Sequence, residues 1–131
     1  MGNYIFVGKL KRYEDMEVWI SARSLVKSIY VISSSPQFSK DYGLRDQIRR
    51  ASVSIASNIA EGSDSQTNSS FGRFLYSARA SASEVRTQLY LALDLNYITQ
   101  VECAQLVSQT NSIGRQITGF ITYLQNSAHK R

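Results

Sequence analysis

Residues 42–62 read YGLRDQIRRASVSIASNIAEG, and this stretch decides how the chain folds. Its apolar residues recur at steps of three and four, which places them on one face of an α-helix. We predict a helix from residue 44 to residue 61, stopped by Gly62, with Asn58 and Glu61 beside the apolar face. The stripe consists of Leu44, Ile48, Ala51, Ile55 and Ile59.

Three further stretches carry an apolar stripe of the same kind, and polar turns separate all four. Asn68 or Ser69 can cap the third helix, and Asn96 can end it in the left-handed conformation that asparagine tolerates. Thr99 with Glu102 has the spacing of a capping box before the fourth helix. The predicted helices lie near residues 15–33, 44–61, 69–95 and 99–125.

Helices joined by short connections run antiparallel to their neighbours. We therefore predict an all-α protein, an up-down-up-down antiparallel four-helix bundle over residues 13–125. Residues 1–12 are expected to be an N-terminal tail and residues 126–131 a C-terminal tail. A chain of 131 residues is long enough for one domain with a real core.

The chain is basic, with fifteen Lys and Arg against ten Asp and Glu. One interpretation is a surface that meets nucleic acid; the other is a mildly basic protein whose arginines pair with carboxylates inside an assembly. Cys103 is the single cysteine, which excludes an intrachain disulfide and favours a reducing compartment. No apolar run approaches the ~18 residues of a membrane span. We expect a cytoplasmic protein that does not enter a membrane.

Catalytic residue types are scarce. His129 is the only histidine and lies in the expected tail, so a histidine-based triad within one chain is not expected. Cys103 and scattered acids do not make a metal site. We predict no enzyme activity, no metal, no cofactor and no small-molecule substrate. Gly114 and Gly119, inside the fourth helix, suggest close helix packing or a local kink.

Six polar residues of the second and third helices form a candidate site. As a structural network they would fix helix register or a subunit interface; as a functional site they would line a polar ligand pocket. Under the first interpretation Glu61 is buried and paired with Arg50 or Arg79. The six are Arg49, Arg50, Asn58, Glu61, Arg79 and Glu84.

Three segments carry a family resemblance: YEDMEVW at 13–19, GLRDQIRRASVSIASNIAEG at 43–62, and FGRFLYSARASASEVRTQLYLALDLNYI at 71–98. Over residues 13–124 the chain resembles the bacterial four-helix-bundle family named for proteins encoded in intervening sequences of large-subunit ribosomal RNA genes. That family is distantly related to the accessory protein of diversity-generating retroelements. Ala80 and Asn96 stand where the family often has glycine. The resemblance implies a five-fold homo-oligomeric ring and an association with ribosomal RNA loci.

The resulting hypothesis is a non-enzymatic, oligomeric bundle protein that binds RNA or DNA through its basic surface. Apolar residues outside the stripes, such as Tyr90, Leu91 and Leu95, would form the contacts between subunits. The alternative is a homo-oligomeric scaffold that binds only protein partners. Arg45 and Arg49 could equally pair with Asp41 and Asp46. The residues expected to contact nucleic acid are Arg45, Arg49, Lys9, Lys11, Arg12, Lys130 and Arg131.

Overall fold

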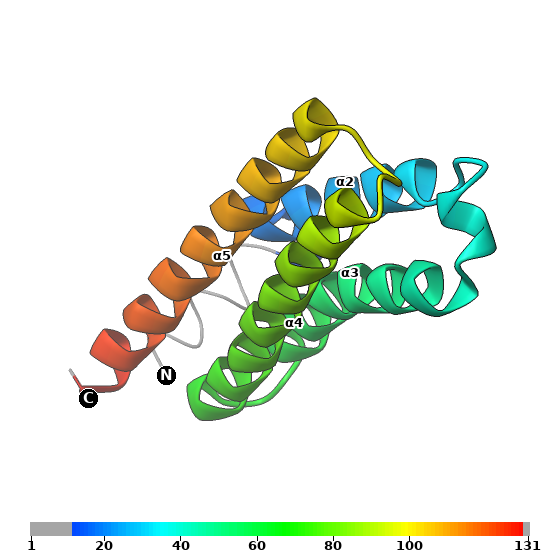
Figure 1. Cartoon of the computed structure of the whole chain (residues 1–131). Coiled ribbons are helices and arrows are strands. Elements are labelled where there is room, and N and C mark those ends of the chain that lie inside the picture. Colours follow the sequence, from blue (N-terminus) through cyan, green and yellow to red (C-terminus); the bar gives the residue numbers. More distant parts are fainter. Residues whose placement is uncertain (1–11, 130–131) are drawn as a thin grey trace.

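A computed structural model describes residues 12–129 of the chain. Its four long helices form an antiparallel bundle in which each helix packs against the next and α2 also contacts α5 (Figure 1). No strand occurs between residues 12 and 129, so the predicted all-α bundle is confirmed. The elements are η1 (Tyr13–Asp15), α2 (Glu17–Ile32), η2 (Phe38–Lys40), α3 (Tyr42–Ser63), α4 (Asn68–Asp94) and α5 (Gln100–His129).

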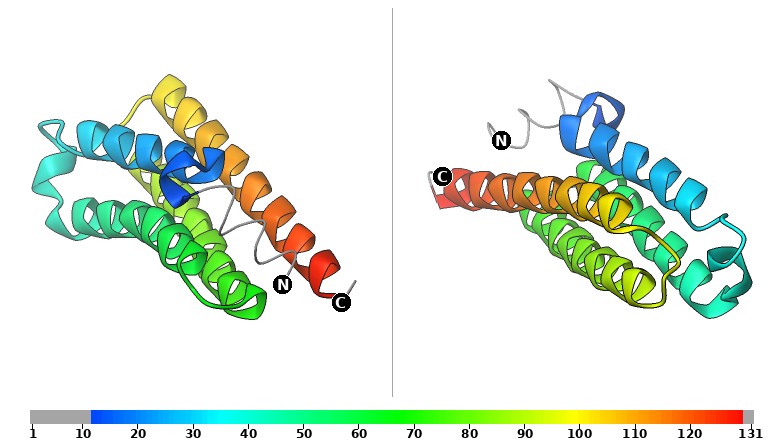
Figure 2. Two further views of the ribbon diagram at one scale, coloured as in Figure 1. Left: turned by 180° about the vertical axis from the view of Figure 1, so that it is seen from behind. Right: turned by 45° about the horizontal axis from the view of Figure 1, so that its top comes forward.

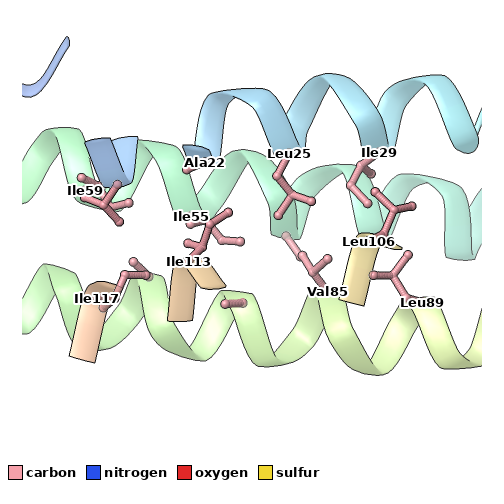
Figure 3. Close-up of a cluster of buried hydrophobic side chains, with 14 of the residues drawn as sticks. Ala22, Leu25, Ile29, Ile55, Ile59, Val85, Leu89, Leu106, Ile113 and Ile117 are labelled. Atoms are coloured by element: carbon pink, nitrogen blue, oxygen red, sulfur yellow. The ribbon is translucent and has the colours of Figure 1, made fainter. Parts of the chain in front are cut away.

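The four apolar stripes meet in one core. Ile55 and Ile59 of the α3 stripe are fully buried, and Leu44 is half-buried at the start of that helix. Figure 3 shows side chains from all four helices pointing toward one another in this cluster. Burial of such side chains stabilises the fold by roughly 1.5–3 kcal/mol each. The cluster includes Ala22, Leu25, Ile29, Val85, Leu89, Leu106, Ile113 and Ile117.

Two connections are tied together at one end of the bundle. Asp41 caps α3, because its Oδ1 accepts a hydrogen bond from the Leu44 backbone N–H at 3.1 Å. The Tyr97 hydroxyl donates to Asp41 Oδ2 at 2.9 Å, which raises the pKa of Tyr97. The Tyr97 ring also stacks on Phe38 at 5.2 Å between centroids. The connection between α2 and α3 is thereby held against the one between α4 and α5.

The predicted end of the third long helix at Asn96 is confirmed. Asn96 has φ 62°, the left-handed conformation expected of it. The Tyr97 N–H donates to the Ala92 carbonyl at 2.9 Å, and the Asn96 N–H donates to the Leu93 carbonyl at 3.0 Å. These two bonds form a Schellman cap that ends α4.

The capping box before α5 is confirmed as well. The Thr99 N–H donates to Glu102 Oε1 at 2.9 Å, and the Glu102 N–H donates to Thr99 Oγ1 at 3.1 Å. The helix that starts there continues to His129, four residues past its expected end, so residues 126–129 extend α5. Of the expected N-terminal tail, only Arg12 belongs to the described residues.

Gly62 does not stop its helix as predicted. It is buried, α3 continues to Ser63, and none of the described glycines has a positive φ. A Cβ atom at Gly62 would lie 2.7 Å from Phe71 Cδ1 and 2.8 Å from Phe74 Cβ. Glycine is therefore needed there because α4 passes too close to α3 for any side chain.

Gly114 and Gly119 behave in the opposite way. A Cβ atom at either position would meet no atom within 4 Å, so the expected close helix packing at these glycines is absent from the described chain.

None of the described helices combines the length and the apolar character that a bilayer span requires.

Candidate functional site

The predicted pairing of Glu61 is wrong. Glu61 is exposed and forms no hydrogen bond or ion pair with any described residue, and Arg50 is exposed as well. The helical phase explains this result, because Glu61 lies about 200° around α3 from the buried Ile59. The carboxylate therefore points away from the core and forms no ion pair with Arg79.

The other members of the six-residue set also have separate neighbours. Asn58 Nδ2 donates to the carbonyl and the hydroxyl of Ser54, at 2.8 and 3.0 Å, within its own helix. Arg79 Nη1 donates to Thr118 Oγ1 of α5 at 3.1 Å. Glu84 is exposed and has no partner within residues 12–129. The contacts of the described chain do not join these residues into a network.

Arg45, one of the residues expected to meet nucleic acid, is held by its own surroundings. Its Nε pairs with Asp46 Oδ1 at 2.9 Å, and its Nη1 donates to the Ser39 carbonyl at 3.1 Å. The guanidinium also lies over the Tyr42 ring, 4.9 Å from its centroid. Its charge is balanced by Asp46 beside it.

Arg49 is held by the end of α2. Its Nε donates to Ser33 Oγ at 2.8 Å, and its Nη2 donates to Ser34 Oγ at 2.9 Å. The guanidinium lies over the Tyr30 ring at 4.6 Å. Arg12 pairs with Glu14 at 2.9 Å in an exposed ion pair. The remaining expected contacts, Lys9, Lys11, Lys130 and Arg131, lie outside the described residues.

A different cluster of arginines lines a hollow of about 500 Å³ between α4 and α5, the helices that run side by side in both views of Figure 2. We call this hollow the arginine groove. Neither of the two ion pairs formed by residues 12–129 involves its arginines, and no Asp or Glu lines it. Its walls are Arg79, Ala82, Ser83 and Arg86 of α4, and Thr110, Asn111, Gly114, Arg115 and Thr118 of α5.

Hydrogen bonds across the groove position two of the three guanidinium groups. Arg86 Nη1 donates to Asn111 Oδ1 at 2.9 Å, as Arg79 donates to Thr118. Both acceptors are neutral, so the two positive charges stay uncompensated. A guanidinium carries five N–H donors, and these bonds use one from each arginine. The remaining donors are free to bind anionic oxygen atoms.

Arg115 faces Arg79 and Arg86 from the opposite wall. It is exposed and has no hydrogen-bond or ion-pair partner in the described chain. Arg79 and Arg86 lie two helical turns apart, about 10 Å along α4. A second hollow, of about 530 Å³, shares Arg115 and Asn111 with the groove and extends it toward Tyr90. The basic surface therefore follows the crevice between the two helices.

The groove has the chemistry of a binding site for phosphate groups.

Cys103 lines the second hollow, but it is buried, and desolvation together with Asp94 raises the pKa of its thiol. A thiol that stays protonated is a poor nucleophile. Among the described residues, no three His, Cys, Asp or Glu side chains lie close enough together to hold a metal ion.

Sequence reasoning placed Arg79 in another role and did not single out Arg86 or Arg115. The sequence did contain one indication of the arginine groove. Arg79 and Arg86 are seven residues apart and therefore share a face of α4. Tyr76 and Tyr90 share that face too and are 45% and 50% exposed.

Comparisons with known proteins agree with the fold. Residues 14–119 match the family described as 23S rRNA-intervening sequence protein. A similar solved structure, from Bacteroides thetaiotaomicron, is described as a protein with unknown function from the S23 ribosomal protein family. Its sequence is 24% identical, its TM-score is 0.74, and the match covers 79% of this chain and 97% of that chain. A comparison with curated proteins found no match.

Proposed function

The chain belongs to the 23S rRNA-intervening sequence protein family, and we propose that it is a non-enzymatic protein that binds single-stranded nucleic acid in the arginine groove. The observation that carries the proposal is the set of three arginines, Arg79, Arg86 and Arg115, without a carboxylate partner. Phosphate oxygens supply the negative charge and the acceptors that these guanidinium groups lack.

A single strand fits this crevice better than a duplex. Proteins that bind single strands combine a basic groove along the backbone with aromatic side chains on which bases stack. Tyr76 and Tyr90 flank the groove arginines on α4 and are about half exposed. A hollow between two packed helices is too narrow to enclose a double helix.

Gly114 gives the proposal a specific test. It lines the groove, and no atom lies within 4 Å of the position that its Cβ would take. Gly114→Leu should fill that space and weaken binding of 12-nucleotide RNA and DNA at least tenfold, as measured by fluorescence anisotropy at low salt. Gly119→Leu is the matched control, because Gly119 lies in the same helix, is exposed, and lines no part of the groove.

Wild-type affinity should fall steeply with added salt, because phosphate contacts release counterions. Absence of binding at low salt would contradict the proposal and favour the alternative of a scaffold that binds only protein partners. Equal weakening by Gly114→Leu and Gly119→Leu would place the binding surface elsewhere.

We infer also that the chain forms a homo-oligomer. Leu91 and Leu95 near the end of α4 are 46% and 50% exposed, Val101 at the start of α5 is 66% exposed, and Val31 of α2 is 68% exposed. Large exposed apolar residues are typical of surfaces that associate. The number five rests on the family resemblance alone.

Sedimentation equilibrium at micromolar concentration should give a single species of five times the 14.7 kDa chain mass. Leu95→Asp should shift this species toward smaller ones, because it adds a charge to the apolar surface. A wild-type monomer would contradict the inference, and a stable dimer or tetramer would contradict the pentamer.

A further inference from the structure

Asn68 has a side chain without a partner. It is 5% exposed, and neither its Nδ2 nor its Oδ1 forms a hydrogen bond in the described structure. Unsatisfied buried amides are rare because desolvation without a hydrogen bond is costly. Asn68 does not cap α4 as expected, and neither does Ser69, because Thr67 Oγ1 accepts the hydrogen bond from the Ser70 N–H at 3.1 Å.

A cavity of about 390 Å³ lies beside Asn68, between the beginning of α4 and the end of α5. This volume falls in the range of small-ligand sites. Gly72 lines it, and a Cβ atom there would meet nothing within 4 Å, so the wall of the cavity is open on that side. Arg73, Tyr76 and Gln125 contribute polar groups to the same cavity. We call it the Asn68 cavity.

The Asn68 cavity adjoins the arginine groove through one pair of residues. Tyr76 lines the cavity and Arg79 lines the groove. The Arg79 guanidinium lies over the Tyr76 ring, 5.0 Å from its centroid. Gln125 Nε2 donates to the Tyr76 hydroxyl at 3.1 Å and fixes the ring from the α5 side. A strand that follows the groove can therefore place a base next to Tyr76.

We propose that the Asn68 cavity receives an unpaired adenine of the strand bound in the arginine groove, an inference that rests on the proposed function. The Asn68 amide offers one donor side and one acceptor side, and both are unused. A phosphate supplies acceptors only. Adenine presents the N6 donor beside the N7 acceptor, which is the pair that an asparagine side chain binds in bidentate fashion.

Both amide atoms of Asn68 are shielded from solvent in the free chain. Rotation of the side chain toward the cavity breaks no hydrogen bond, because the amide makes none there. Binding of the base would then give the amide donor and the amide acceptor of Asn68 a hydrogen-bond partner each. The complex would therefore no longer carry the desolvation penalty of an unsatisfied buried amide.

Two 12-nucleotide RNA strands test this inference: one of uridine alone, and one with adenine at every third position. Wild-type protein should bind the adenine-containing strand about tenfold more tightly, the discrimination expected of one bidentate pair. Asn68→Ala should bind the uridine strand with wild-type affinity and lose the preference for adenine. Its melting temperature should equal or exceed that of the wild type, because the substitution removes no hydrogen bond.

A second variant, Gly72→Leu, fills the cavity from the next turn of α4 while residue 68 stays asparagine, and it should abolish the preference in the same way. An adenine preference that survives both substitutions, or a wild type without one, would overturn the inference while leaving the groove proposal intact. Failure of both strands to bind at low salt would overturn the groove proposal and this inference with it.

Discussion

Gly62→Ala is expected to lower the free energy of unfolding by about 3 kcal/mol, the upper part of the usual range for an overpacked core. The added methyl group would lie 2.7 Å from Phe71 Cδ1 and 2.8 Å from Phe74 Cβ. The Phe74 Cβ atom is fixed to the backbone of α4, so rotation of a side chain cannot relieve both contacts. The helices α3 and α4 must separate, which loosens the packing along their shared face.

Urea denaturation followed by circular dichroism measures this loss. The matched control is Gly119→Ala, the same substitution in a helix at a position with no neighbour within 4 Å. It should raise the free energy of unfolding by about 1 kcal/mol, because alanine is the better helix former. If Gly62→Ala stabilised the protein as Gly119→Ala does, the close approach of α3 and α4 would be refuted.

The triple substitution of Arg79, Arg86 and Arg115 to Gln is expected to reduce affinity for single-stranded nucleic acid on the order of a hundredfold at low salt. Each phosphate contact adds about 0.7 to the slope of log affinity against log salt for single strands. Removal of three contacts should therefore lower the slope by about 2. Stability should change little, because none of the three belongs to an ion pair within residues 12–129, and the hydrogen bonds that Arg79 and Arg86 donate to α5 are exposed to solvent.

A control with equal loss of charge separates the groove from the overall field of the protein. Arg23, Arg45 and Arg50 lie on α2 and α3, and their triple substitution to Gln also removes three positive charges. Affinity for the same strand should fall less than tenfold. If both triple variants lost affinity and slope equally, the net charge would explain binding and the groove would have no special role.

The sequence could predict whatever depends on neighbours a few residues away. The stripe through Ile55 and Ile59, the left-handed Asn96, and the capping box of Thr99 and Glu102 all follow from helical periodicity and local hydrogen bonding. The structure confirms each of them.

The rest depends on how whole helices face one another. Gly62 has the residue type of a helix stop, and only the approach of Phe71 and Phe74 reveals its packing role. The exposure of Glu61, by contrast, could be predicted, because Glu61 follows Ile59 of the apolar stripe by two residues and so lies about 200° around the helix from it.

The candidate site could not be predicted for the same reason. Asp46 follows Arg45 directly in the sequence, so their ion pair could be predicted, but the bonds that Ser33, Ser34 and Ser39 of the preceding connection accept from Arg45 and Arg49 could not. The arginine groove combines residues of α4 and α5 that are brought together only by the packing of those helices.

Photo-crosslinking of wild-type protein to a 12-nucleotide RNA that contains 4-thiouridine tests the groove most directly. Mass spectrometry of the digested complex then identifies the crosslinked peptides, whatever the oligomeric state. The groove proposal predicts crosslinks within residues 73–90 of α4 and 111–118 of α5. Crosslinks confined to α2 and α3, around Arg45 and Arg49, would contradict it.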